Sequence, residues 1–197
     1  MKLLIRELSD QKLLDKCKTL FSSILTLKKL FVGDNYCANL LDWFNEVVQK
    51  NIAIKKSIDK GMNQEKFKKY RQHVYWINFG RGVGSEFQDY HYALVLFEAE
   101  HTALVVPLTS KKEHDPKWIE KNKEVIVDLG LVEGYPDENK ECYACTFLVS
   151  SVSKKRLDRC GNKTDGYFDI KITDEQMLKI CDKIKEIADN KVKVVDK

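Results

Sequence analysis

Residues 74–86 read VYWINFGRGVGSE. The first six residues of this stretch are β-branched or aromatic apart from one asparagine, and glycines follow. This pattern is typical of a strand that ends in a loop. Further runs of similar composition continue along the chain, separated by segments rich in Gly, Asp, Asn or Lys: YHYALVLF (90–97), TALVVPL (102–108), EVIVDL (124–129) and ACTFLVSSVS (144–153). The sequence therefore predicts a small, mostly antiparallel β-domain.

Two segments of this domain carry more specific signals. The run YHYALVLF is apolar on both faces, which predicts a central strand with the core on one side and a helix or a subunit on the other. Thr173 and Gln176 have the spacing of a capping box, and a helical stripe follows them. We therefore expect a closing helix packed on the sheet, with its stripe formed by Met177, Ile180, Cys181, Ile184 and Ile187.

The first 70 residues have the periodicity of helices instead. Apolar residues recur at three- and four-residue intervals from residue 9 to 31, behind Ser9 and Asp10, which can cap the first amide groups. Gly33, Asp34 and Asn35 interrupt the pattern before a second stripe over residues 37–48. A third stretch around 52–70 contains Gly61, and whether it continues the second helix stays open.

Composition and charge narrow the class of protein. The chain of 197 residues is 43% hydrophobic and 32% charged, as in folded globular proteins. No apolar run approaches the length of a membrane span, and charged residues interrupt the first ten positions, so we expect a cytoplasmic protein that does not enter a membrane. In that compartment its six cysteines are expected to be reduced. The net charge is only +4, but residues 50–71 contain eight basic and two acidic residues.

Four ordered blocks resemble the MazF/PemK family of toxin ribonucleases. That family has a basic turn before a strand like VYWVDF, a Gly-Ser-Glu loop, then segments like RPALVLS, VVPLTS and a basic KxRL. This chain has RQHVYWINFGRGVGSE (71–86), HYALVLF (91–97), VVPLTSKK (105–112) and SSVSKKRL (150–157) in the same order. The resemblance covers about residues 71–160.

The resemblance implies an α+β fold, namely an SH3-like small β-barrel with a C-terminal helix over residues 71–190, preceded here by a helical extension over 1–70. It further implies a usually homodimeric toxin of a toxin-antitoxin system that cuts single-stranded RNA without a metal or other cofactor. The cognate antitoxin would occupy the RNA groove. Cleavage by the ribose 2′-hydroxyl leaves a cyclic phosphate and a 5′-hydroxyl.

Such cleavage needs a base, an acid and donors that stabilise the charged phosphorane. The family's catalytic arginine and threonine map to His91 and Thr109, so the threonine matches and the arginine is replaced. Histidine lacks the permanent guanidinium charge, but an unperturbed imidazole titrates near neutral pH and can transfer protons. Glu86 is a supporting candidate.

The remaining candidates would contact RNA. Basic side chains can bind phosphates, small loop residues let the chain approach the substrate, and hydroxyls can hydrogen-bond phosphates or bases. The predicted RNA-binding residues are Arg81, Gly84, Ser85, Ser110, Lys111, Lys112, Ser151, Lys154 and Arg156. Phe87, Tyr90 or Tyr92 could stack an unpaired base.

Several alternatives stay open. His91 could merely pack between its tyrosine neighbours, which would leave a weakened relative that binds RNA or antitoxin. A gyrase poison of the CcdB type, which shares the fold, is less favoured because the chain ends KVKVVDK without a terminal tryptophan. Cys142 and Cys145 have the spacing of half a zinc site, but no second close pair follows. The N-terminal helices could extend the RNA-binding surface or cover the groove.

Overall fold

We analysed a computed structural model of the chain, which describes residues 9–31, 35–61, 69–82, 87–135 and 140–192. The chain divides into two compact units, Met1–Val48 and Gln49–Lys197. The domain boundary that the sequence predicts at residue 70 stays a prediction.

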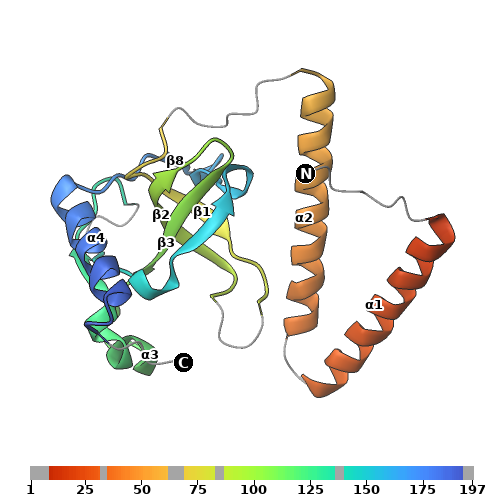
Figure 1. Cartoon of the computed structure of the whole chain (residues 1–197), viewed down its shortest axis with the longest axis horizontal. Helices are drawn as coiled ribbons and strands as arrows, with labels where there is room; N and C mark the ends of the chain where they lie inside the picture. The colour runs from red at the N-terminus through yellow and green to blue at the C-terminus, as the bar shows by residue number, and fades with distance from the viewer. Residues whose placement is uncertain (1–8, 32–34, 62–68, 83–86, 136–139, 193–197) are drawn as a thin grey trace. The chain divides into compact units, whose positions relative to one another are not determined.

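Two long helices occupy the N-terminal part of the chain (Figure 1). Helix α1 spans Asp10–Leu30, and the hydroxyl of Ser9 accepts a hydrogen bond from the amide of Lys12, as the predicted cap requires. Helix α2 spans Tyr36–Asp59, so the third helical stretch continues the second helix as far as Asp59. Gly61 follows at a φ of 62°, a conformation that commonly ends helices.

The second unit is built around an antiparallel sheet. Its six strands are β1 (Val74–Asn78), β2 (Tyr90–Glu98), β3 (Thr102–Ser110), β4 (Val127–Gly130), β5 (Cys142–Ala144) and β6 (Ser150–Ser153). A small hairpin follows, formed by β7 (Cys160–Asn162) and β8 (Gly166–Phe168). Helices α3 (Lys117–Lys121) and α4 (Asp174–Ala188) and the 3-10 turns η1 (Lys123–Val125), η2 (Thr146–Leu148) and η3 (Lys154–Arg156) complete the unit.

Strand β3 organises the sheet because different strands pair with its two halves. Strand β2 pairs along one edge as far as Pro107. On the other edge, β6 pairs with residues 102–105 and β5 pairs with residues 108–110. At the far side of the sheet, backbone hydrogen bonds of 2.9 Å in both directions join Trp76 to Asp158, just beyond β6. This bridge joins the edge strand β1 to the segment that follows η3, so the sheet is curved.

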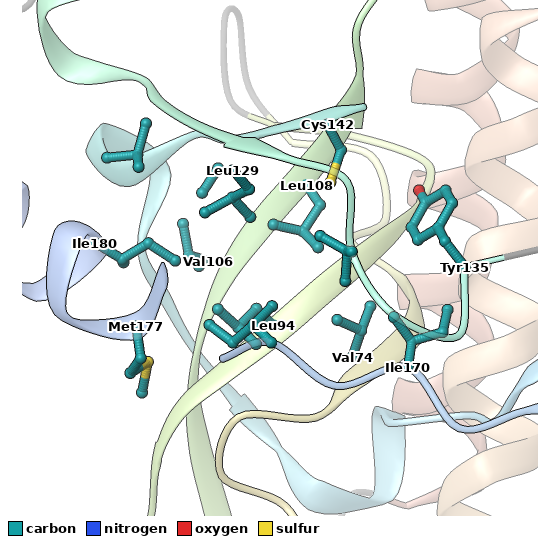
Figure 2. Packing of buried hydrophobic residues seen from close by; sticks show 14 of the residues in the cluster. Val74, Leu94, Val106, Leu108, Leu129, Tyr135, Cys142, Ile170, Met177 and Ile180 are labelled. Atoms are coloured by element: carbon teal, nitrogen blue, oxygen red, sulfur yellow. The ribbon is translucent and has the colours of Figure 1, made fainter. Parts of the chain in front are cut away.

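The predicted central strand is confirmed, since β2 lies between β1 and β3 and is buried on both faces. On one face, Leu94 packs with Val106 and Leu108 of β3 and with Ile180 of α4 (Figure 2). On the other, Ala93 and Val95 belong to a second cluster with Tyr70, Ile77, Val152 and Leu157. One face of β2 is thus covered by the closing helix and the other by a core of the unit's own strands and turns, which agrees with the predicted core on one side and helix on the other.

The closing helix is also confirmed. Thr173 and Gln176 form the capping box of α4, with the Thr173 hydroxyl accepting from the Gln176 amide and the Gln176 side chain accepting from the Thr173 amide. Met177 and Ile180 are buried against the sheet, whereas Cys181 is exposed. The run ACTFLVSSVS is not one strand, because η2 interrupts it where the Thr146 hydroxyl donates to the backbone of Val125. The fold is α+β, as predicted.

Candidate active site

The opening between β2 and β3 brings His91 and Thr109 into one pocket. The last paired residues of the two strands are Ala93 and Pro107, and the same register continued by two residues sets His91 opposite Thr109. Residues opposite one another in an antiparallel pair share a face of the sheet. Beyond the ladder the strands border a pocket of about 390 Å³, lined by Trp76, Tyr90, His91, Tyr92, Leu108, Thr109, Ser110, Lys112, Tyr135 and Lys140.

A β-bulge determines this register. Glu98 pairs with Ala103 and Phe97 with Leu104, but Val95 pairs with Val105, so Leu96 is the extra residue on β2. Without the bulge, His91 would be opposite Ser110 and on the other face from Thr109. The bulge therefore places the two candidate catalytic residues together.

His91 is held in place by its neighbours on β1 and the preceding loop. It pairs with Ile77 across the β1–β2 ladder, and the rings of His91 and Phe87 lie 4.3 Å apart between centroids. The imidazole is half-buried and still borders the pocket. His91 is thus packed against an aromatic ring and also accessible to a substrate, so the packing role and the chemical role do not exclude one another.

Aromatic rings form one wall of the pocket. The ring centroid of Trp76 lies 4.7 Å from that of Tyr92 and 5.9 Å from that of Tyr90, and Tyr92 lies 5.0 Å from Tyr135. Burial raises the pKa of the Tyr92 and Tyr135 hydroxyls, so both stay protonated at neutral pH and can donate hydrogen bonds. Such a wall can stack an unpaired base.

Two lysines supply the positive charge of the pocket. Among the described residues, neither Lys112 nor Lys140 has a carboxylate partner, and no described lining residue is acidic. Lysines that have no ion-pair partner can neutralise a phosphate group. The pocket therefore combines a histidine, hydroxyl groups, aromatic rings and ammonium groups, which suit a nucleotide.

Lys111 is arranged differently from its neighbour Lys112. Its amino group lies 2.6 Å from the carboxylates of both Asp128, in β4, and Glu141, just before β5. These hydrogen bonds raise the pKa of Lys111. The backbone amide of Lys111 also donates to the carbonyl of Glu141 at 2.9 Å. Lys111 thus ties the end of β3 to the segment that carries Lys140, and its charge is already compensated.

Four other predicted RNA-binding residues do not line the pocket. Arg81 pairs with Asp89 at 2.9 Å and donates to Gln88. The amino group of Lys154 lies 4.4 Å from the Tyr70 ring centroid, and the guanidinium of Arg156 donates to the carbonyl of Asn78 at 2.6 Å. Ser151 is exposed on β6, opposite Leu104. Their assignment to RNA stays a prediction, and the contacts of Arg81, Lys154 and Arg156 are structural.

The remaining candidates, Gly84, Ser85 and Glu86, lie outside the described residues. Sequence reasoning assigned no site role to Trp76, Tyr135 or Lys140, although all three line the pocket. Trp76 could have been found from the sequence, because it lies in the strand that leads into the glycine-rich loop. In the structure it pairs with Tyr92, the neighbour of His91. Tyr135 and Lys140 are distant in sequence, and only the tertiary structure brings them to the pocket.

The cysteines form no metal site within the described chain. No group of three or more His, Cys, Asp or Glu side chains there could hold a metal ion. Cys142 and Cys160 are buried in the core, and burial raises the pKa of each thiol to about 12. These two thiols are therefore protonated at neutral pH. Among the described helices, none is long and apolar enough to cross a membrane.

Comparisons with known proteins give the family. No curated protein matches the chain. Among solved structures, MazF (Form-I) from Deinococcus radiodurans is similar with a TM-score of 0.43 and 14% sequence identity, over 63% of this chain and 99% of that one. The family described as the PemK-like, MazF-like toxins of type II toxin-antitoxin systems matches residues 70–188, which are more than half of the chain. The chain therefore belongs to the PemK/MazF family of type II toxins.

Proposed function

We propose that the chain is the toxin of a type II toxin-antitoxin system and acts as a metal-independent endoribonuclease on single-stranded RNA. Membership of the toxin family supports the toxin role and implies an antitoxin partner. The observation that carries the catalytic part is the pocket between β2 and β3, which His91, Thr109, Lys112 and Lys140 all line.

In this proposal the pocket catalyses transfer of a phosphoryl group from the 5′-oxygen of one nucleotide to the 2′-oxygen of the preceding one. The 2′-oxygen of a ribose attacks the adjacent phosphorus, and His91 takes the proton of the 2′-hydroxyl as general base. The bond from phosphorus to the 5′-oxygen breaks, and that oxygen receives a proton from His91 or from water. The products are a 2′,3′-cyclic phosphate and a 5′-hydroxyl, so no water is consumed.

The other pocket residues stabilise the charge that develops. The Thr109 hydroxyl donates to a phosphorane oxygen, and Lys112 and Lys140 compensate its negative charge. The aromatic wall of Trp76 and Tyr92 holds a base next to the reacting phosphate. These interactions place the substrate without the guanidinium that the family usually has at position 91.

The test is cleavage of mixed-sequence RNA by purified protein in the presence of a chelator, with sequencing of both new ends. We expect cuts that carry a cyclic phosphate and a 5′-hydroxyl. His91→Ala and Thr109→Val should each slow cleavage at least about tenfold, the lower range for loss of an acid-base group or a phosphorane donor.

The chain offers matched controls at the other end of the same two strands. His101 lies in the β2–β3 turn with its side chain 84% exposed, and Thr102 begins β3. His101→Ala and Thr102→Val should leave cleavage unchanged. RNA that stays intact at high protein excess would refute the nuclease and favour a relative that only binds RNA or antitoxin.

A further inference from the structure

A second, shallower pocket adjoins the candidate active site. It has a volume of about 560 Å³ and is lined by Lys111, Lys112, Leu131, Lys140, Glu141 and Tyr143. Two of these residues, Lys112 and Lys140, also line the pocket of His91 and Thr109. The two pockets are therefore neighbours with a shared border made of two lysines.

The floor of the second pocket is held by a network of hydrogen bonds. The Tyr143 hydroxyl donates to Asp115 at 2.7 Å, and the backbone amide of Lys112 donates to the same carboxylate at 3.1 Å. Lys111 is fixed by Asp128 and Glu141. The backbone that carries Lys112 is thus anchored to β5, while the amino groups of Lys112 and Lys140 keep no ion-pair partner among the described residues.

The rim carries an exposed apolar group. The side chain of Leu131 is 57% exposed, although the leucine borders a polar surface. The ring of Tyr143 is partly buried on the same floor, 5.4 Å from the amino group of Lys111. The pocket combines an apolar rim, an aromatic floor and a border with two ammonium groups that have no ion-pair partner among the described residues. These features match a nucleotide with its base against Leu131 and Tyr143 and its phosphate at the lysines.

We propose that this pocket is a subsite for the nucleotide on the 3′ side of the scissile phosphate, and that Lys112 and Lys140 hold that phosphate between the two nucleotides. The subsite rests on the proposed RNA-cleaving function. It would make longer RNAs bind more tightly than RNAs that fill the active-site pocket alone. Lys111 would act as a positioning residue, because its charge is compensated and it fixes the segment before β5.

The test measures binding and needs no catalysis. Fluorescence anisotropy gives the Kd of the full chain for two ligands: a labelled 2′-O-methyl nucleoside 3′-monophosphate, which fills the active-site pocket alone, and a mixed-sequence octanucleotide of 2′-O-methyl RNA. In both ligands the 2′-hydroxyl that would act as nucleophile is blocked. We expect the octanucleotide to bind more tightly. Leu131→Ala should weaken octanucleotide binding roughly fivefold, as estimated from the apolar area a base would cover, and leave binding of the monophosphate unchanged.

The lysines give a second readout. Lys140→Gln should weaken both ligands and lower the slope of log Kd against log salt by about 0.7, the value for one phosphate on a single strand. Leu178→Ala and Lys185→Gln are matched controls, because both residues are exposed on α4 and line neither pocket, with Leu178 60% exposed. Both controls should bind like the wild type.

Two outcomes would overturn the subsite. One is equal octanucleotide affinity of Leu131→Ala and the wild type, and the other is no gain in wild-type affinity with length. Because all the side chains concerned are exposed, thermal unfolding of each variant should match the wild type and rule out misfolding. Failure of the proposed function would appear separately, as uncut RNA in the chelator assay.

Discussion

Lys111 and Lys112 are adjacent in sequence, yet the structure predicts opposite consequences when each is changed to glutamine. The Lys111 amino group lies 2.6 Å from Asp128 and from Glu141, and its side chain is 27% exposed. Each such pair at a surface stabilises by about 0.2–1 kcal/mol. Lys111→Gln also leaves two carboxylates close together, so it should lower the free energy of unfolding by about 1–2 kcal/mol.

Lys112→Gln removes an exposed charge without an ion-pair partner among the described residues, so its free energy of unfolding should change by less than about 0.5 kcal/mol. Its effect should appear in RNA binding, where the slope of log Kd against log salt falls by about 0.7. Lys111→Gln should leave that slope unchanged.

Urea unfolding and anisotropy titrations of the two variants measure both quantities. The destabilisation by Lys111→Gln should shrink at high salt, because salt screens the ion pairs that the variant lacks. The reasoning would be refuted if Lys112→Gln were the destabilised variant, or if Lys111→Gln lowered the salt slope as much as Lys112→Gln.

Two further predictions concern the fold and the floor of the second pocket. Ile180 of α4 is fully buried against the sheet, so Ile180→Ala should lower the free energy of unfolding by about 2–5 kcal/mol. Leu178→Ala, at an exposed position of the same helix, should change it by less than about 0.5 kcal/mol. Equal urea midpoints of the two variants would contradict this packing. The hydrogen bond from the Tyr143 hydroxyl lowers the pKa of the Asp115 carboxyl in the folded protein. Asp115 therefore stabilises the fold above its unfolded pKa of about 3.9, and this stabilisation is lost as the pH falls through the lower pKa of the folded state. In Tyr143→Phe, NMR should show the Asp115 pKa raised toward about 3.9, and a pKa unchanged from the wild type would show that the hydroxyl is not the cause.

Much of the fold could be predicted because its signals are local. The consecutive apolar residues of β2 indicate burial on both faces, and the Thr173–Gln176 capping box marks the start of α4. The short strands were not predicted because their local sequence signal is too weak. Strands β5, β7 and β8 have three residues each, too few for an alternating pattern to emerge.

The candidate site was less predictable because it depends on register and on distant segments. The resemblance indicates His91 and Thr109 separately, but the bulge at Leu96 that sets them opposite one another has no mark in the sequence. Likewise, Lys111 and Lys112 look equivalent in the sequence. Only the approach of Asp128 and Glu141 to one of them distinguishes a structural lysine from one that can bind phosphate.

The central claim is that His91 transfers a proton during RNA cleavage, and the dependence of the single-turnover cleavage rate on pH tests it most directly. The wild-type rate should rise with pH as the imidazole loses its proton and then level off. His91→Arg supplies a group that does not titrate in this range. The account predicts that the step near neutral pH disappears in this variant, and the same step in both proteins would contradict it.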